Sequence, residues 1–167
     1  MISSAHAKDL VLYNKWQNET VYTLCDELAD AERRKDRGMF FRSIHNTLNH
    51  IITINEAIIA LLQTGKPREI NVQDFPLDTF ESLRDACTQF DRRLLDLTVE
   101  VNDAWFAGIL VFESERLGRK RQMPRAFMFA QMMNHATHHR SQVTSELYKM
   151  GIDYGNTDMP YNPYVEY

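Results

Sequence analysis

The chain has 167 residues, of which 44% are apolar and 25% are charged, and its formal net charge at pH 7 is −4. This composition is ordinary for a soluble globular protein and too apolar for a disordered one, and the length predicts a single domain over residues 1–167. The acidic balance disfavours nucleic-acid binding through bulk electrostatics.

Neither the termini nor the cysteines point to export or to a membrane. No apolar run approaches the ~20 residues that a membrane span needs, and the N-terminal residues lack the layout of a signal peptide. Cys25 and Cys87 form no CxxC pattern, so we interpret them as reduced, buried side chains. We therefore expect a cytoplasmic protein.

The first half of the chain predicts two long helices. Residues 4–29 have apolar side chains at helical spacing, and the charged residues 30–37 predict a solvated connection. Residues 41–64 are apolar on several sides, which is typical of a buried helix, and Gly65 is a stop signal.

The second half predicts two more helices and a short insertion between them. Residues 66–77 predict a crossing loop, and a helix capped by Asp78 is expected to run from there to about residue 100. A hairpin is predicted over residues 105–112, returning through 119–123. The last helix should run from Pro124 to before Gly151, and the tail (152–167) is expected to pack on the body. The fold class is therefore predicted to be all-α, a four-helix bundle with a small β-hairpin or irregular insertion before the last long helix.

Three of the six histidines lie within five residues of the last helix. His135 and His139 are four residues apart, so they share one helix face at a spacing that suits one metal ion. His50 lies among apolar residues in the second helix. Three histidines leave an open coordination position, which is typical of a catalytic metal site rather than a structural one. No HExxH motif supplies a glutamate, so the catalytic residues stay unknown.

Each histidine also has a simpler interpretation. A lone inward histidine is more often a core residue bonded to a neighbour, and an i,i+4 pair is by itself a weak metal signal. His138 is predicted to be exposed. The alternative is that its side chain holds one of the metal ligands in place. His45 is too far around its helix to share a site with His50, and Arg140 is predicted to make an ion pair.

Two further features have competing interpretations. The aromatic pair Tyr13 and Trp16 predicts core packing, with a substrate-pocket wall as the alternative. A basic cluster near the hairpin predicts a solvated turn, with nucleic acid or an acidic thiol substrate as alternatives; its members are Arg116, Arg119, Lys120, Arg121 and Arg125.

Three stretches of the sequence resemble the DinB (damage-inducible protein) family, within the DinB/YfiT-like group. Residues 13–18, YNKWQN, are similar to the family's YNxWAN opening. Residues 43–50, SIHNTLNH, resemble its SIxxTLNH segment, and residues 134–142, NHATHHRSQ, resemble its NHxxHHRGQ signature. Ser141 replaces the usual glycine, and Glu56 stands where aspartate is common.

The resemblance implies a four-helix bundle, often dimeric, with one divalent metal ion, zinc or nickel, on His50, His135 and His139. The wider group includes transferases and an isomerase that use low-molecular-weight thiols. The family name records induction by DNA damage and does not establish DNA binding.

Two hypotheses follow from the residues and the resemblance. The first is a metalloenzyme that activates a thiol or a water at the three-histidine site, as a thiol-dependent transferase or a hydrolase with a small-molecule substrate. The alternative is a non-enzymatic, metal-binding stress-response scaffold that acts as a homodimer. Nucleic acid is the least favoured partner.

Overall fold

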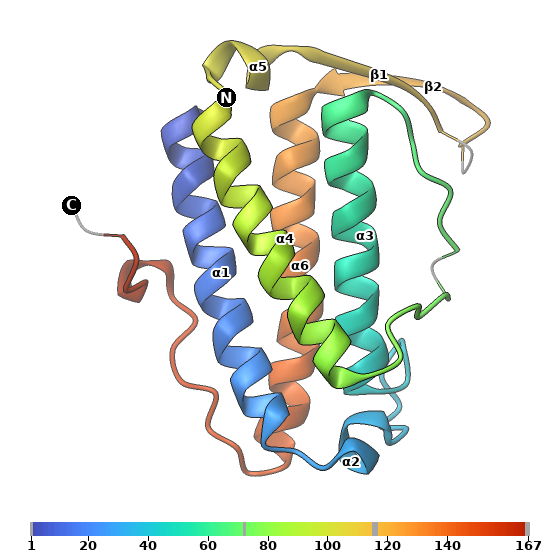
Figure 1. Cartoon of the computed structure of the whole chain (residues 1–167), viewed down its shortest axis with the longest axis vertical. Helices are drawn as coiled ribbons and strands as arrows, with labels where there is room; N and C mark the ends of the chain where they lie inside the picture. The colour runs from blue at the N-terminus through green and yellow to red at the C-terminus, as the bar shows by residue number, and fades with distance from the viewer. Residues whose placement is uncertain (1, 72, 115–116, 166–167) are drawn as a thin grey trace.

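The computed structural model describes residues 2–71, 73–114 and 117–165 (Figure 1). Its body consists of four long helices, α1 (Ser4–Asp26), α3 (Ile44–Thr64), α4 (Phe80–Glu100) and α6 (Arg125–Lys149). Two antiparallel strands, β1 (Ile109–Ser114) and β2 (Arg119–Pro124), precede α6. The predicted four-helix bundle with a small hairpin before its last helix is confirmed.

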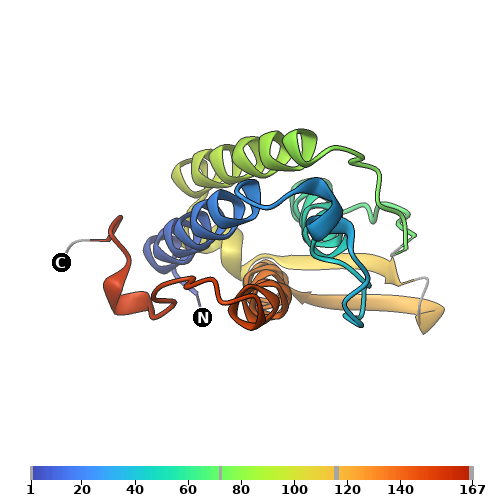
Figure 2. The ribbon, with the colours of Figure 1, turned by 90° about the horizontal axis from the view of Figure 1, so that it is seen from below.

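The order of the helices around the bundle brings distant parts of the sequence together. α1 and α3 each contact both α4 and α6 (Figure 2). α3 and α4 run in the same direction, because the chain between Gly65 and Thr79 returns to the end where α3 began, and α1 and α6 run the opposite way (Figure 1). α3 and α6 are therefore antiparallel neighbours, and their side chains can build one site between them.

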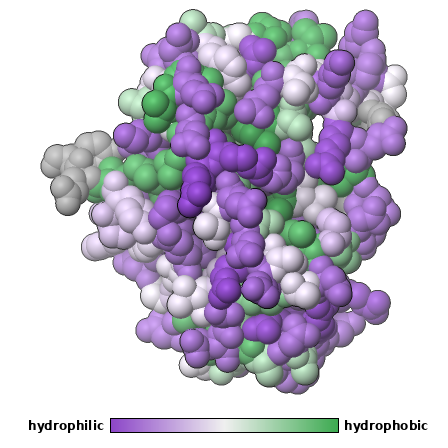
Figure 3. All heavy atoms as spheres, viewed as in Figure 1, coloured by the Kyte–Doolittle hydropathy of each residue, from purple (hydrophilic) through white to green (hydrophobic). Residues whose placement is uncertain are grey.

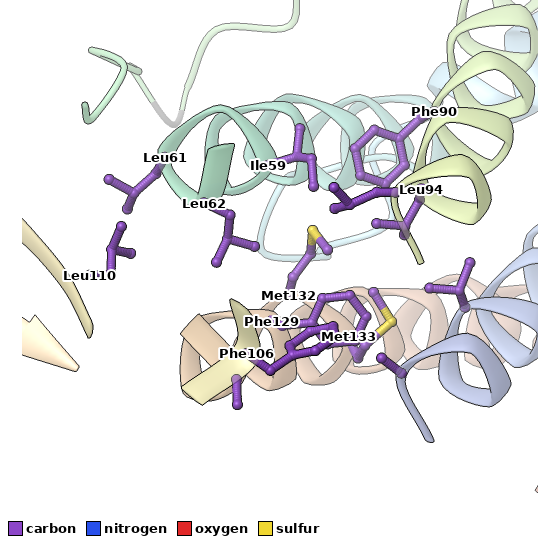
Figure 4. Close-up of a cluster of buried hydrophobic side chains, with 14 residues drawn as sticks. Ile59, Leu61, Leu62, Phe90, Leu94, Phe106, Leu110, Phe129, Met132 and Met133 are labelled. Carbon is purple, nitrogen blue, oxygen red and sulfur yellow. The ribbon is translucent and has the colours of Figure 1, made fainter. Parts of the chain in front are cut away.

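Buried apolar side chains fill the bundle along its length. At the hairpin end, Phe90, Phe106 and Phe129 meet with leucines and methionines from α3, α4 and α6 (Figure 4). Burial of each of these rings stabilises the fold by about 1.5–3 kcal/mol. A second cluster, around Leu48, Leu83 and the two cysteines, continues the core toward the other end. The helices are thus held rigidly enough to fix the side chains between them.

Helix α3 begins three residues later than the sequence predicts. Ser43 caps it, because the Ser43 hydroxyl accepts a hydrogen bond from the Asn46 N–H at 3.2 Å. Arg42 has a φ of 70°, outside the helical region, so Phe41 lies before the helix. At the other end, Gly65 has a φ of 71° and its N–H donates to the Leu61 carbonyl at 2.8 Å, which confirms the predicted stop.

Replacing Ser43 by alanine is expected to lower the free energy of unfolding by about 1 kcal/mol, because the first turn of α3 loses its side-chain cap. Thermal unfolding should show a Tm lower by roughly 2–4 °C. Ser145→Ala, at an exposed position within α6, is the matched control and should change the Tm by less than half as much. Equal shifts for both variants would contradict this role of Ser43.

The insertion before α6 differs from the prediction. Residues 105 and 106 belong to a short helix, α5 (Asp103–Ala107), and the hairpin begins only at Ile109. The Asn102 side chain starts this helix by accepting a hydrogen bond from the Trp105 N–H at 3.0 Å. A local cap of this kind outweighs the strand preference of the aromatic pair.

Three other boundaries also differ. The cap of α4 is Thr79 rather than Asp78, since its hydroxyl accepts from the Ser82 N–H at 3.1 Å. Pro124 ends β2, so α6 begins one residue later than predicted. The predicted connection over residues 30–37 contains the short helix α2 (Asp30–Arg34), which has no buried residue and so keeps its solvated character.

The C-terminal segment packs on α1, as predicted. The Tyr13 hydroxyl donates to the Thr157 carbonyl at 2.7 Å, and the Gln17 amide donates to the Asn156 carbonyl at 3.3 Å. A one-turn helix, η2 (Met159–Tyr161), follows these contacts. Across the whole described part of the chain, no helix has the length and apolar character that a membrane crossing requires.

Candidate metal centre

Two neighbouring helices bring three histidine side chains together. His50 lies on α3, and His135 and His139 lie one turn apart on α6. One ring nitrogen from each histidine lies within 4.8 Å of the other two. The Nε2 atoms of His50 and His135 are 3.1 Å apart. The structure therefore gathers the three predicted residues at one point, although they are up to 89 positions apart in the sequence.

Two neighbouring side chains orient these rings. The Nδ1 atom of His139 is 2.8 Å from the Gln142 Oε1 atom, so this nitrogen donates to the amide and leaves Nε2 as the acceptor. The Phe41 ring stacks on the His50 ring with centroids 3.9 Å apart and planes 27° apart. Such partners fix a ligand's tautomer and angle in metal sites.

The roles of Phe41 and Gln142 were not predicted from the sequence. Gln142 could have been found, because it lies three residues after His139 and so shares its helix face. Phe41 gave no such signal. It lies outside α3, and the positive φ of Arg42, which the sequence does not reveal, turns it toward His50.

The surroundings favour the neutral form of the His135 and His139 rings. Burial lowers the pKa of His135 to about 3, and the nearby His139, His50 and His138 rings contribute to this lowering. Burial also lowers the pKa of His139, against the effect of the hydrogen bond that its ring donates to Gln142. Neutral imidazole is the form that binds a metal ion.

The donor set and its spacing fit a divalent transition metal. Imidazole nitrogens suit zinc, nickel, copper and iron. Two nitrogens that each lie 2.0–2.1 Å from a tetrahedral ion are about 3.3 Å apart, close to the 3.1 Å between the His50 and His135 nitrogens. The Nδ1 atom of His135 is buried without a hydrogen-bond partner among the described residues, so the polar contact of this ring is the one that its Nε2 atom makes with His50.

The other described histidines contribute no nitrogen to this cluster, although the His138 ring contacts the His139 ring with centroids 4.8 Å apart. His138 is exposed, as predicted, and its Nε2 atom lies 3.4 Å from the Gln142 amide nitrogen. His45 is buried and its Nε2 atom is 3.0 Å from the Leu77 carbonyl oxygen, so it fixes the segment that leads to α4. The prediction that His45 and His50 do not share a site is confirmed, and His6 is exposed.

Arg140 follows His139 but points into the opposite side of α6. Its guanidinium is buried and donates to the Asn14 and Asn18 side-chain oxygens of α1. The amide groups of these asparagines donate to the Asp91 carboxylate on α4, with all three distances 3.0 Å. The predicted ion pair of Arg140 is therefore replaced by two amides that bridge the guanidinium and the carboxylate. We call these four residues the Arg140 network.

The Arg140 network predicts a pH dependence of stability. Burial raises the pKa of the Asp91 carboxyl to about 6, although hydrogen bonds from Asn18 and Asn14 and the Arg140 charge oppose it. An unfolded aspartate has a pKa of about 3.9. The folded protein therefore holds this proton more tightly, and the stability it contributes is present below about pH 4 and lost as the pH rises through 6.

Urea unfolding of the metal-free protein between pH 4 and pH 7 checks this expectation. The stability of the natural protein relative to Asp91→Asn should fall by about 2–3 kcal/mol as the pH rises. Asp85→Asn, an exposed position on the same helix, should show no such trend. A constant difference between Asp91→Asn and the natural protein would refute the raised pKa.

The remaining predicted residues have structural contacts. Glu56 forms an ion pair with Arg93 of α4. Tyr13 is half-buried, and its hydroxyl holds the C-terminal segment, so the predicted core packing of this residue is only partial. The Trp16 ring contacts the Tyr13 ring edge-on, with ring centroids 6.1 Å apart. Cys25 and Cys87 are buried free thiols, so the prediction that both side chains are buried is confirmed.

Two of the basic residues near the hairpin, Arg125 and Lys120, have partners away from the histidine cluster. Arg125 donates to the Leu62 carbonyl at 3.2 Å and lies over the Trp105 ring, and Lys120 is 3.8 Å from the Glu113 carboxylate. Ten residues of helix, about 15 Å, separate Arg125 from His135. Arg116 lies outside the described residues. The cluster is thus a poor candidate for binding the acidic end of a substrate held at the histidines.

Solved structures with the same fold come from bacteria. YfiT from Bacillus subtilis, described as a probable metal-dependent hydrolase with an unusual four-helix bundle topology, matches with a TM-score of 0.69 and 12% identity over 92% of each chain. A DinB-like protein from Bacillus cereus matches with a TM-score of 0.63 and 20% identity, over 84% of this chain and 90% of that one. At these identities the likeness establishes the fold alone.

Sequence comparison gives the family. No curated protein matches the chain. The sequence model of the DinB family matches residues 1–167, from one end of the bundle to the other. The chain therefore belongs to the DinB family.

Proposed function

We propose that the protein is a metalloenzyme that holds one divalent metal ion, zinc or nickel, on His50, His135 and His139. The observation that carries this proposal is the convergence of three ring nitrogens within 4.8 Å of one another. The lowered pKa values of His135 and His139 and the hydrogen bond from His139 to Gln142 support it. The description of YfiT as a probable metal-dependent hydrolase agrees with it.

The proposed reaction is hydrolysis of a small molecule or transfer of a thiol to one. When bound, the ion supplies Lewis-acid chemistry, lowering the pKa of a coordinated water or thiol. The chain's own contribution is to orient the ligands: Gln142 holds the His139 ring by its Nδ1–H, and Phe41 covers one face of the His50 ring and excludes water from it. Three protein ligands leave room for a substrate atom at the ion.

Metal content and turnover test this function together. Protein purified without a histidine tag should carry about one zinc or nickel ion per chain. The metal-loaded and chelator-treated forms should then be compared on activated esters and on low-molecular-weight thiols paired with electrophiles. Metal-dependent turnover supports the metalloenzyme, whereas a loaded protein that turns over none of these substrates would favour the scaffold hypothesis instead.

Gln142→Leu is expected to weaken metal binding by roughly 10–100-fold, because His139 loses the acceptor that fixes its tautomer and angle. Leucine has a similar size, so packing on α6 should be preserved. Competition with a chromogenic chelator measures the affinity, and Ser145→Ala, exposed on the same helix, is the control. Unchanged affinity in Gln142→Leu would remove this residue from the site.

We also propose that the protein forms a homodimer. Ile109, Val111 and Phe127 are 56%, 53% and 63% exposed at the hairpin end of the bundle, and a second copy of the chain would bury this apolar surface. Light scattering should give a mass near twice 19.6 kDa. A Val111→Lys variant should shift it toward the monomer, and a monomeric natural protein would rule the dimer out.

A further inference from the structure

A cavity of about 230 Å³ lies between α1 and α4, on the side of these helices away from the histidine cluster. None of the three histidines lines it. Its rim is formed by polar residues of both helices, on the face that Figure 3 shows as largely hydrophilic. Its volume is below the 300–1,000 Å³ range typical of sites for drug-sized ligands. The cavity therefore suits a small molecule.

The floor of the cavity contains a buried carboxylate. Asp91 is 4% exposed, and its Oδ1 atom accepts from the Asn14 and Asn18 amides. Its Oδ2 atom accepts from Asn18 and faces the Cys87 thiol at 3.9 Å. A carboxylate offers about four acceptor positions, and a thiol is a weak donor. The second position of Oδ2 therefore meets only a weak donor, and a stronger donor could displace the thiol from it.

A second polar group lies beside this carboxylate. The Tyr22 hydroxyl is buried and lies beside the Cys87 thiol, which is only a weak hydrogen-bond partner. Tyr22 is only 6% exposed and lines the cavity with its ring stacked on Phe80. A buried hydroxyl without any partner costs about 1–3 kcal/mol, and a thiol offsets only part of this cost, so a ligand that formed a stronger hydrogen bond with Tyr22 would be favoured.

The charges around the cavity favour a cation. Four acidic side chains line it, against two basic ones: Glu19, Asp26, Glu27 and Asp91 against Lys15 and Arg84. The two cations are already paired, Lys15 with Glu19 and Arg84 with Asp26. Among the described residues, the lining thus has two carboxylates without a cation of their own. The nearest buried cation, Arg140, reaches Asp91 only through the asparagine amides.

We propose that this cavity is a binding site for a small organic cation, with a primary ammonium group at Asp91 and an apolar body between α1 and α4. The ammonium donates to Asp91 Oδ2 in place of the weak Cys87 thiol contact, and the Tyr22 hydroxyl accepts from it. The apolar part packs against the Tyr22 ring. This site is separate from the proposed metal centre and does not depend on its function.

Benzylamine is the probe, and benzyl alcohol is its neutral counterpart of similar shape. In a titration of the metal-loaded, ¹⁵N-labelled protein, benzylamine should give saturable shifts confined to residues 15–27 and 84–91, with a Kd near ~1 mM, as expected for so small a ligand. Benzyl alcohol should bind at least ~10-fold more weakly, because it lacks the charge-assisted hydrogen bond.

Substitutions in and outside the cavity locate the bound benzylamine. Asp91→Asn should lose at least ~10-fold in benzylamine affinity, while Asp85→Asn keeps it. Thr88→Trp fills the cavity from its rim without touching the Arg140 network, and should abolish binding even if Asp91→Asn proves unstable. A double His135→Ala, His139→Ala variant should bind benzylamine normally, which distinguishes this site from amine binding to the metal.

Three results would overturn the proposal. The first is the absence of saturable binding of benzylamine to the natural protein. The second is equal affinity for benzylamine and benzyl alcohol, which would show that the cavity recognises only apolar surface. The third is benzylamine binding that survives Thr88→Trp or disappears with the histidine variant.

Discussion

Replacing His135 and His139 together by alanine is expected to abolish metal binding, with the affinity for zinc or nickel falling by at least ~1,000-fold. The reason is that two of the three nitrogens that converge within 4.8 Å are lost, and the single remaining imidazole of His50 cannot hold an ion against water. Isothermal titration of the chelator-treated protein gives the affinity directly.

The control for this variant is His138→Ala. His138 is adjacent in sequence and exposed, and its side chain lies beside Gln142. Its removal should leave the stoichiometry at one ion and the affinity within about threefold of the natural protein, as for a surface change. If His138→Ala lost the metal and the double variant kept it, the assignment of ligands would be wrong.

Replacing Arg140 by methionine should lower the free energy of unfolding by about 3–5 kcal/mol, the loss typical of breaking a buried charge network. The methionine leaves two buried amide oxygens, on Asn14 and Asn18, without their donor, and it removes the positive charge nearest to Asp91. Urea unfolding at pH 7 measures the change, which corresponds to a Tm lower by roughly 10 °C.

Two further substitutions show whether this loss is specific. Arg140→Lys keeps the charge without the forked donors, so about half of the loss should remain. Lys8→Met removes an exposed charge from α1 and should cost less than about 1 kcal/mol, as expected for a surface substitution. A similar loss in Arg140→Met and Lys8→Met would mean that the Arg140 network does not stabilise the bundle.

The network also bears on the metal centre. Arg140 and His139 are consecutive on α6, and their side chains are held on opposite sides of the helix by α1 and α3. Fixing the arginine fixes the rotation of α6 about its axis. The rotation of α6 in turn decides whether His135 and His139 face His50.

Much of the fold could be predicted from local signals in the sequence. The helical periodicity of the four long segments, the stop at Gly65 and the tail's aromatic content all led to confirmed features. The errors fell where a single side chain decides a boundary. Asn102 caps α5 and Thr79 caps α4. Whether a polar side chain caps a helix or faces solvent depends on backbone angles that helical periodicity does not predict.

The histidine cluster could be predicted because helical spacing and burial are both readable from sequence. The groups around it could not. Asn14, Asn18 and Asp91 come from two helices and are polar residues in positions that sequence patterns assign to solvent, yet each is buried. Their burial follows from the order of the helices around the bundle, which places α1 and α4 next to each other and α6 against α1.

Anomalous diffraction at a metal absorption edge, from crystals of untagged protein, is the decisive measurement for the three-histidine site. One strong peak is expected between His50, His135 and His139, within about 2.0–2.2 Å of one nitrogen of each ring. Solvent or a small ligand should occupy the fourth position around that peak. A peak elsewhere on the molecule, or no peak in fully folded protein supplied with zinc and nickel, would contradict the assignment of these histidines as a metal centre.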